Sequence, residues 1–330
     1  MERGNDRDIP RGPLEEGQVM EWGIAINLRE PVSEIIEKAV VADHGGIDTV
    51  WITDYPATRL SPIIASEVAK KTKNCRIGVG LLSPLIYSPL HIVQIMNTLV
   101  DMHGDRFDLL LGPGDRTKLR DIGVDYGNTS TFVERMRESV ITIREKLADD
   151  NELRVFMGAQ GPKMIEVSTS CDGVLLNYSD SQMIQWAISL LGKKSKNFKI
   201  GVFPPSLIGF SKPCNEHKGI KTSAAVVALG LSPSILREFR LGDNLHPAIK
   251  RVKEFGLSND IVEMIDQSIL DRFSLCGSIE SNIKHLSNYQ QIGVDIIVYA
   301  PPQGASLEGV ERLVAAKREH NKITRSPYRE

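Results

Sequence analysis

Short apolar runs alternate with helical patterns along most of the chain, and this alternation limits the possible folds more than any other feature. We expect strands at 22–28, 47–53, 76–82, 107–111, 153–157, 173–177, 198–210 and 294–299. Helical patterns lie between or after them, at 32–43, 61–71, up to 101, 131–147, 162–170, 180–191, 278–293 and 306–320. Strands joined by helices run parallel, because the helix returns the chain to the same end of the sheet. The pattern predicts an α/β fold, a (β/α)8 TIM barrel.

One late segment interrupts the alternation. Residues 212–273 contain helical patterns and turn signals at Ser232-Pro233 and His246-Pro247, with no convincing strand. A helical insertion after the seventh barrel strand accounts for this segment. A doubly wound open sheet is the alternative that the alternation leaves open. We predict a single barrel domain at 20–330 with its insertion at about 212–273.

The composition of the chain limits the kinds of molecule that it is expected to bind. Residues 1–19 are rich in charge, Gly and Pro and lack an apolar segment, which predicts a flexible arm and not a signal peptide. No run is apolar for long enough to cross a bilayer, so we expect a soluble, cytoplasmic protein. The 40 basic and 42 acidic side chains give a net charge of -2, which offers no electrostatic case for nucleic acid or membrane as partner. We expect a small-molecule substrate.

The cysteines and histidines show no grouping that would support a metal site or a hydrolase. Cys75, Cys171, Cys214 and Cys276 stand singly, without C-x-x-C spacing. This argues against zinc and against a disulfide scaffold, so we expect reduced, mostly buried cysteines. The 7 histidines are dispersed, and no Ser-His-Asp spacing is present.

Two strand-like runs end in glycine and proline where a helix should begin. They are Phe156-Met-Gly-Ala-Gln-Gly-Pro-Lys163 and Leu109-Leu-Leu-Gly-Pro-Gly-Asp115. Backbone N–H groups at a helix start lack internal partners, and Gly158 and Gly161 would let an anion approach them. Gly-Pro pairs also mark ordinary turns, and each motif alone leaves both interpretations open. Together the two breaks indicate a ligand lying across several loops at one end of the barrel.

Five motifs occur in order at expected strand ends. They are Trp51-Ile-Thr-Asp54, Ser83-Pro84 with Ser88-Pro89, Leu111-Gly-Pro-Gly-Asp115, Met157-Gly-Ala-Gln-Gly-Pro162, and Phe273-Ser274 through Gly277. From about residue 20 to residue 304 the chain resembles the archaeal methylenetetrahydromethanopterin reductases, which are bacterial-luciferase-like barrels. The resemblance implies coenzyme F420 as hydride carrier and methylene-tetrahydromethanopterin or a related acceptor as substrate. It also implies a homodimer or homotetramer.

The resemblance assigns the cofactor-binding residues. It places the phosphate and tail of F420 at Gly158, Ala159, Gln160 and Gly161, with Lys163 adding a positive charge, although Lys163 could equally be a solvated helix residue. The other cofactor-binding residues that it implies are Thr53, Asp54, Gly80, Leu81, Ser83, Gly112, Gly114 and Asn177.

Two positions carry particular expectations. At Gly80-Leu81 the family has a non-prolyl cis peptide that bulges under the deazaflavin ring, whereas the residues alone favour an ordinary strand with a close-packed glycine. Asp115 is implied as the catalytic residue, near the reacting carbon, where a carboxyl group could orient the pterin or help handle a proton. Taken alone, an aspartate after glycine is also a common turn or helix cap.

The chain departs from the family at two sites. Ala25 stands where the family has a glutamate, and Tyr55 stands where a histidine is common. Alanine cannot accept or deliver a proton, so either Asp115 acts alone, or the acceptor differs, or catalysis has been lost. We therefore keep two alternatives: a flavin-dependent (FMN) monooxygenase, and a non-catalytic paralogue that binds F420 or a pterin. No metal is expected.

Overall fold

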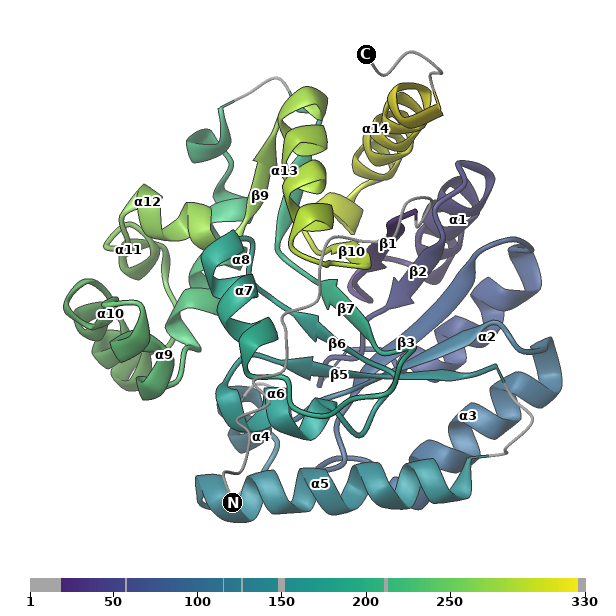
Figure 1. The fold of residues 1–330 in the computed structure, drawn as a ribbon, viewed down its shortest axis with the longest axis horizontal. Coiled ribbons are helices and arrows are strands. Elements are labelled where there is room, and N and C mark those ends of the chain that lie inside the picture. The colour runs from purple at the N-terminus through teal and green to yellow at the C-terminus, as the bar shows by residue number, and fades with distance from the viewer. Residues whose placement is uncertain are drawn as a thin grey trace, which may run out of the picture.

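A closed barrel of parallel strands forms the body of the protein (Figure 1). The computed structural model describes residues 19–56, 58–114, 116–125, 127–147, 152–210 and 213–325. The barrel strands are β1 (Glu21–Ile26), β2 (Thr49–Ile52), β3 (Arg76–Leu82), β4 (Phe107–Leu111), β5 (Arg154–Ala159), β6 (Gly173–Leu176), β7 (Lys199–Val202) and β10 (Ile296–Tyr299). Their order around the barrel is β1-β10-β7-β6-β5-β4-β3-β2, which confirms the TIM barrel.

Helices surround the barrel (Figure 1). They are α1 (Val32–His44), α2 (Ser61–Lys71), α3 (Pro89–His103), α4 (Arg116–Asp121), α5 (Thr129–Lys146), α6 (Pro162–Ser168), α7 (Ser181–Ser189), α13 (Ile279–Gln291) and α14 (Leu307–Arg325). Helices α3, α5, α7 and α13 begin at side chains that accept first-turn N–H groups, namely Ser88, Asn128, Asp180 and Ser278. The sequence did not indicate the short helix α4. No helix in the described part of the chain is long and apolar enough to span a membrane.

The expected seventh strand is wrong beyond Val202. Beyond Val202 the chain keeps only an isolated bridge to the end of β10, between Pro205 and Ala300. Strand β8 (Ser206–Ile208) then pairs in parallel with β9 (Leu275–Gly277) in a separate two-stranded sheet. Pro204 and Pro205 explain the break, because neither has an N–H group with which to continue the ladder. The apolar pattern of this segment gave no indication in the sequence that its strand partner changes.

Helices fill the segment between β8 and β9, as expected for the insertion. They are η1 (Cys214–Glu216), α8 (Lys218–Leu229), α9 (Pro233–Glu238), α10 (Gly242–Phe255), α11 (Asn259–Val262), α12 (Gln267–Leu270) and η2 (Asp271–Phe273). Residues 1–18 of the expected flexible arm lie outside the described residues, and that expectation stays a prediction.

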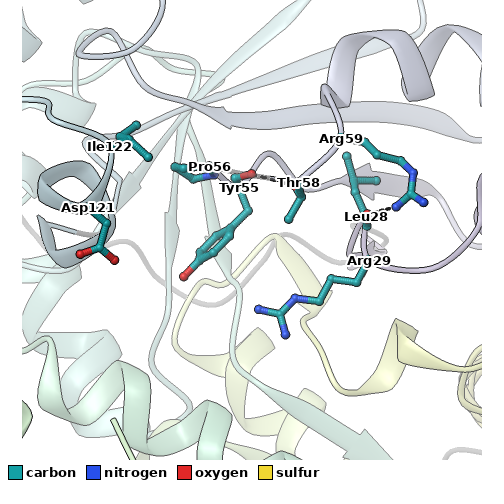
Figure 2. Close-up of a pocket in the computed structure, with 8 residues that line it drawn as sticks. All are labelled: Leu28, Arg29, Tyr55, Pro56, Thr58, Arg59, Asp121 and Ile122. Atoms are coloured by element: carbon teal, nitrogen blue, oxygen red, sulfur yellow. Dashed lines mark hydrogen bonds between the residues drawn. The ribbon is translucent and has the colours of Figure 1, made fainter. Parts of the chain in front are cut away.

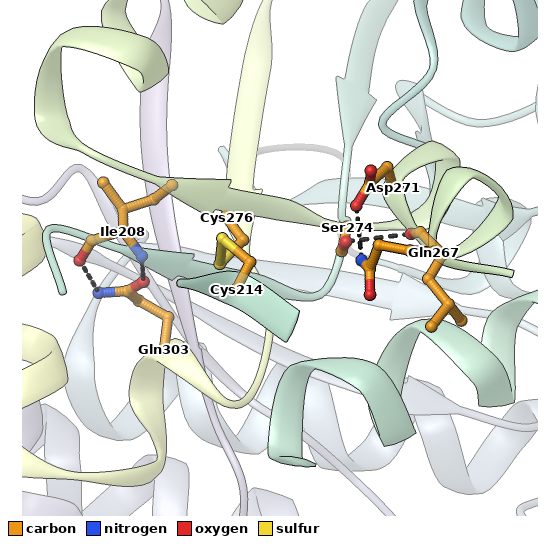
Figure 3. Close-up of a disulfide and its surroundings, with 8 residues drawn as sticks. Ile208, Cys214, Gln267, Asp271, Ser274, Cys276 and Gln303 are labelled. Atoms are coloured by element: carbon orange, nitrogen blue, oxygen red, sulfur yellow. Dashed lines mark hydrogen bonds between the residues drawn. A yellow bond between two sulfur atoms is a disulfide. The ribbon is translucent and has the colours of Figure 1, made fainter. Parts of the chain in front are cut away.

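A disulfide joins Cys214 to Cys276, with their Cα atoms 5.9 Å apart (Figure 3). The expectation that all cysteines are reduced is therefore wrong for this pair, whereas Cys75 and Cys171 are free and buried. The pair is 62 residues apart, and only the pairing of β8 with β9 brings the two segments together. The bond encloses helices α8 to α12 in one covalent loop.

The buried Gln303 holds the same small sheet to the barrel. Gln303 lies in η3 (Gln303–Ala305), just after β10, and is fully buried. Its Oε1 accepts from the Ile208 N–H at 2.5 Å and its Nε2 donates to the Ile208 carbonyl at 3.4 Å (Figure 3). The same Nε2 also donates to the Gly309 carbonyl at 2.7 Å. The disulfide therefore joins the start of the insertion to β9, and the Gln303 amide holds β8, which precedes the insertion, to the barrel.

The barrel interior is filled by side chains and is not a channel. The inner cluster consists of Ala25, Trp51, Leu110, Phe156, Leu175, Ile296 and Val298. Gly78 makes room for the Trp51 ring, because a Cβ at position 78 would overlap it. At the N-terminal end, the buried Asp108 carboxylate accepts from Arg76 Nε at 2.8 Å and from Arg154 Nη2 at 2.7 Å. That end is closed by ion pairs, which leaves the carboxyl ends of the strands for ligand binding.

Candidate functional site

The ends of β3, β4 and β5 meet around the side chain of Leu81. The Gly80–Leu81 peptide bond is cis, which confirms the expectation drawn from the resemblance. Leu81 packs against the inner cluster, as does Phe203. Its Cδ1 lies so close to Gly112 and Gly158 that a Cβ on either glycine would press against it. Four of the expected cofactor-binding residues thus come together, and they form an apolar floor at the mouth of the barrel.

Ser83 joins the loops after β3 and β4. It is buried, its hydroxyl donates to the Pro113 carbonyl at 2.9 Å, and its Oγ accepts from the Leu85 N–H at 3.2 Å. Gly114 follows in the left-handed region, with φ 83°, where glycine is the favoured residue. Ser83 and Gly114 thus shape the loop that carries Gly112, and the Ser83 hydroxyl already has partners within the protein.

Thr53 and Asp54 fix the loop after β2. The Thr53 hydroxyl donates to the Ile26 carbonyl at 3.0 Å. Asp54 Oδ1 accepts from the Ser61 N–H at the start of α2 at 3.1 Å, and its Oδ2 accepts from the Tyr87 hydroxyl at 3.1 Å. Burial and then the Asp54 charge raise the pKa of Tyr87 to about 12, so this phenol stays a proton donor near neutral pH. Contact of Thr53 and Asp54 with a cofactor stays a prediction.

The loop after β5 touches the helical insertion. Gln160 Nε2 donates to the Val227 carbonyl in α8 at 3.2 Å, and the Gln160 carbonyl accepts from the Tyr178 hydroxyl. Gly161 faces Ser232, the residue before α9. The Gln160 amide therefore holds the insertion against the barrel. Ala159 is buried in β5, and Lys163 is exposed on α6.

Asn177, directly after β6, has a buried Oδ1 with no hydrogen-bond partner among the described residues. A buried acceptor without a donor costs roughly 1–3 kcal/mol. An N–H group of a bound ligand would satisfy it, so this atom fits a ring with an N–H group at the mouth.

Two positions, Asp115 and Ala25, bear on catalysis, and so does the arrangement of potential metal ligands. Asp115 lies outside the described residues, so its role stays a prediction. Ala25 is fully buried beside Trp51 in the inner cluster, so a methyl group faces the interior at the position where the resemblance implies a carboxylate. Among the described residues, no group of three or more His, Cys, Asp or Glu side chains is placed to hold a metal ion.

A cavity of about 570 Å³ lies beside the mouth, between the loops after β1 and β2 and the end of α4 (Figure 2). Its lining residues are Leu28, Arg29, Tyr55, Pro56, Thr58, Arg59, Asp121 and Ile122. The sequence reasoning singled out Tyr55 but missed Arg29 and Arg59. The sequence did contain a signal for these two residues, because each arginine follows closely after an expected strand, where ligand-binding loops of a barrel lie.

Comparison with known proteins places the chain in a family. The chain is 26% identical over 328 residues to a 5,10-methylenetetrahydromethanopterin reductase of Methanolobus tindarius, covering 89% of this chain and 98% of that protein. It is 23% identical to the reductase of the same name from Archaeoglobus fulgidus, covering 80% and 88%. The solved structure of the coenzyme F420 dependent tetrahydromethanopterin reductase from Methanopyrus kandleri superposes with a TM-score of 0.74 at 18% identity, covering 91% and 99%. The luciferase-like monooxygenase family model matches residues 13–295, so the chain belongs to the luciferase-like monooxygenase family.

Proposed function

We propose that this protein is a coenzyme F420-dependent oxidoreductase that transfers hydride between reduced deazaflavin and methylene-tetrahydromethanopterin or a related acceptor. The observation that carries the proposal is the apolar floor made by Leu81 over Gly112 and Gly158 at the mouth of the barrel. Relatives named as methylenetetrahydromethanopterin reductases, which match most of the chain, support the choice of reaction.

The residues at the mouth suit a flat ring with an acidic tail. Leu81 would support one face of the ring, and Asn177 Oδ1 would accept a ring N–H. Gly158, Gly161 and the exposed Lys163 would hold the phosphate of the tail, since glycines allow close approach and Lys163 supplies positive charge. Bound F420 supplies two-electron hydride chemistry, because a carbon replaces the reactive nitrogen of the flavin ring.

The protein's own contribution is binding, orientation and exclusion of water. The insertion is held at Gln160 and by the Cys214–Cys276 bond, which keeps it beside the β5 loop. A fixed cover near the ring limits water at the reacting centre. We assign Asp115 to orienting the acceptor or handling a proton, because position 25 has no carboxyl group.

Cofactor titration tests the proposal. Purified protein is titrated separately with F420 and with FMN, and the quenching of cofactor fluorescence is followed. Oxidation of reduced F420 by methylene-tetrahydromethanopterin is then followed by absorbance. We expect F420 binding and turnover. Tight FMN binding without F420 binding would replace the proposal with the flavin-dependent alternative.

Loss of catalysis is a second candidate, favoured by the buried methyl group of Ala25 in the inner cluster. In that case the protein binds F420 or a pterin without turnover. The Ala25→Glu variant separates the two: turnover in the variant and none in the wild type would identify a paralogue that has lost its carboxylate. The added carboxylate is also expected to destabilise the fold, so unfolding is measured in parallel.

We also propose a homo-oligomer, a homodimer or a homotetramer. Large apolar side chains are exposed around the starts of the neighbouring helices α2 and α3, with Leu60 54%, Ile63 60% and Leu90 57% accessible. Grouped exposed apolar residues are typical of subunit contacts. Sedimentation analysis of the wild type and of Ile63→Asp tests this, and a monomeric wild type would refute it.

A further inference from the structure

The Cys214–Cys276 disulfide lies at the start of helix α8 (Figure 3). Cys214 is in η1, directly before α8, and the His217 N–H donates to the Cys214 carbonyl at 3.1 Å. Both bonded cysteines are partly exposed, whereas the free Cys75 and Cys171 are buried. Burial raises the pKa of each free thiol to about 12, so neither readily forms the thiolate that exchange requires. The bonded pair is therefore the site in this chain that is open to thiol–disulfide exchange.

The opposite end of α8 contacts the loop after β5. The Val227 carbonyl accepts from Gln160 Nε2 at 3.2 Å, and Ser232, which precedes α9, faces Gly161. Helix α8 has 12 residues, so it is about 18 Å long at roughly 1.5 Å per residue. It packs mainly against α10, α11, α12 and η2, which all belong to the insertion. The helix thus connects the disulfide to the expected phosphate-binding loop as one stiff element.

The end of the insertion is attached to the barrel independently of the disulfide. Arg272 Nε in η2 lies 2.7 Å from Asp180 Oδ2, and the Arg272 carbonyl accepts from the N–H groups of Ser179 and Asp180, each at 3.1 Å. By contrast, β8 and β9 pair over only 3 residues each, and two short strands are marginally stable without further support. Breaking the disulfide would loosen the start of α8 while the end of the insertion stays attached.

We propose that the Cys214–Cys276 bond is a reversible redox site, reduced by a dithiol, and that its state controls how firmly α8 holds the loop after β5. The inference rests on the proposed function, because this loop is expected to bind the phosphate of F420, and it adds a means of regulating that site. The oxidised form holds the loop in place for the coenzyme, and the reduced form releases it.

The exchange needs no reactant other than the dithiol. One thiolate of the dithiol attacks a sulfur of the bond and displaces the other cysteine as a thiolate, which forms a mixed disulfide. The second thiol of the reductant then attacks the mixed disulfide and releases the protein. Two electrons and two protons pass from the dithiol to the protein, which leaves two cysteine thiols and one disulfide within the reductant. Reoxidation is the reverse of these steps.

Hydrogen–deuterium exchange read by mass spectrometry tests the coupling without any coenzyme. We expect reduction of the wild type by dithiothreitol to speed exchange in peptides covering 218–229 and 159–163, with β1 to β3 unchanged. Cys276→Ser should match the reduced wild type with or without dithiothreitol. Cys171→Ala, which removes a buried thiol and keeps the bond, is the matched control and should respond as the wild type does. Unchanged exchange at 159–163 after reduction, or free Cys214 and Cys276 thiols in untreated protein, would overturn the proposal.

F420 titration of the two redox forms tests the consequence for binding. We expect reduction to weaken F420 binding to the wild type about fivefold or more. Coupling between two sites is reciprocal, so saturating F420 should shift the dithiothreitol equilibrium towards the disulfide by the same factor. Reduction should have a smaller effect in Gln160→Ala, because that variant lacks the hydrogen bond to α8.

The two experiments separate failure of this proposal from failure of the proposed function. Equal F420 affinity in the oxidised and reduced wild type would overturn the proposal, because the bond would then only brace the insertion. If neither form binds F420, the proposed function fails, while the hydrogen–deuterium exchange still decides whether the bond controls the loop after β5.

Discussion

The Leu81 side chain occupies the space into which any residue larger than glycine at position 112 would extend. Because Leu81 also borders Gly158, one side chain determines which residues the ends of two neighbouring strands, β4 and β5, can carry. The glycines of both strand-end motifs therefore have a packing role before any ligand binds. Their second role is to leave the backbone open to a ligand at the mouth.

The first prediction concerns this packing. Gly112→Ala should displace Leu81, cost about 1–3 kcal/mol through overpacking, and weaken F420 binding because the floor is distorted. The measurements are urea unfolding and the fluorescence titration. Gly192→Ala is the control, since a Cβ there meets no atom within 4 Å. Unchanged F420 affinity in Gly112→Ala would mean that the floor does not contact the coenzyme.

The second prediction concerns Asp115. Asp115→Asn should lower kcat by roughly 10²–10⁴-fold if the carboxyl group handles a proton, with F420 binding retained. Steady-state kinetics and the fluorescence titration measure the two effects separately. Asp101→Asn, at an exposed position of α3, is the control. A variant with wild-type kcat would remove Asp115 from the mechanism.

The third prediction concerns the disulfide. Cys276→Ser should lower the free energy of unfolding by about 2–4 kcal/mol, because the bond closes a long loop around the insertion. Reductant should lower the denaturant midpoint of the wild type to a similar extent and leave that of the variant unchanged. If reductant has no effect on the wild type, the two cysteines are not bonded in solution.

The fourth prediction concerns pH. Asp43 is buried, and its carboxylate accepts the N–H groups of Lys73 at 3.0 Å, Asn74 at 2.8 Å and Cys75 at 2.7 Å. Burial by itself raises the pKa of Asp43, but these hydrogen bonds outweigh it and hold the pKa below the ordinary value of 3.8. The Asp43 carboxylate therefore binds a proton more readily in the unfolded chain than in the folded protein. Its stabilising contribution is present above that ordinary value and is lost as the pH falls through the lower, folded-state pKa.

Asp43→Asn should accordingly be about 1–3 kcal/mol less stable near neutral pH, because an amide cannot accept all three N–H groups. The difference from the wild type should shrink in acid. Urea unfolding of both proteins from about pH 7 to about pH 3 measures it. Asp101→Asn again serves as the control. A difference that stays constant over this range would show that the charge of Asp43 does not contribute.

Sequence alone determined the repeating unit and the position of the glycine breaks. Strand and helix periodicities depend on residues that are close in the chain, so the barrel strands other than β7 were predicted to within a few residues. The glycine breaks were recognisable for the same reason: glycine and proline act on their own backbone. The cis Gly80–Leu81 bond was expected from the resemblance and not from the residues.

Tertiary structure decided the contacts between residues that are far apart in the chain. Cys214 and Cys276 meet only because β8 pairs with β9 outside the barrel. Arg29 and Arg59 line one cavity only because β1 and β2 are neighbours in the closed barrel. Such pairings depend on how the whole chain closes and packs, and no local pattern of residues carries that information.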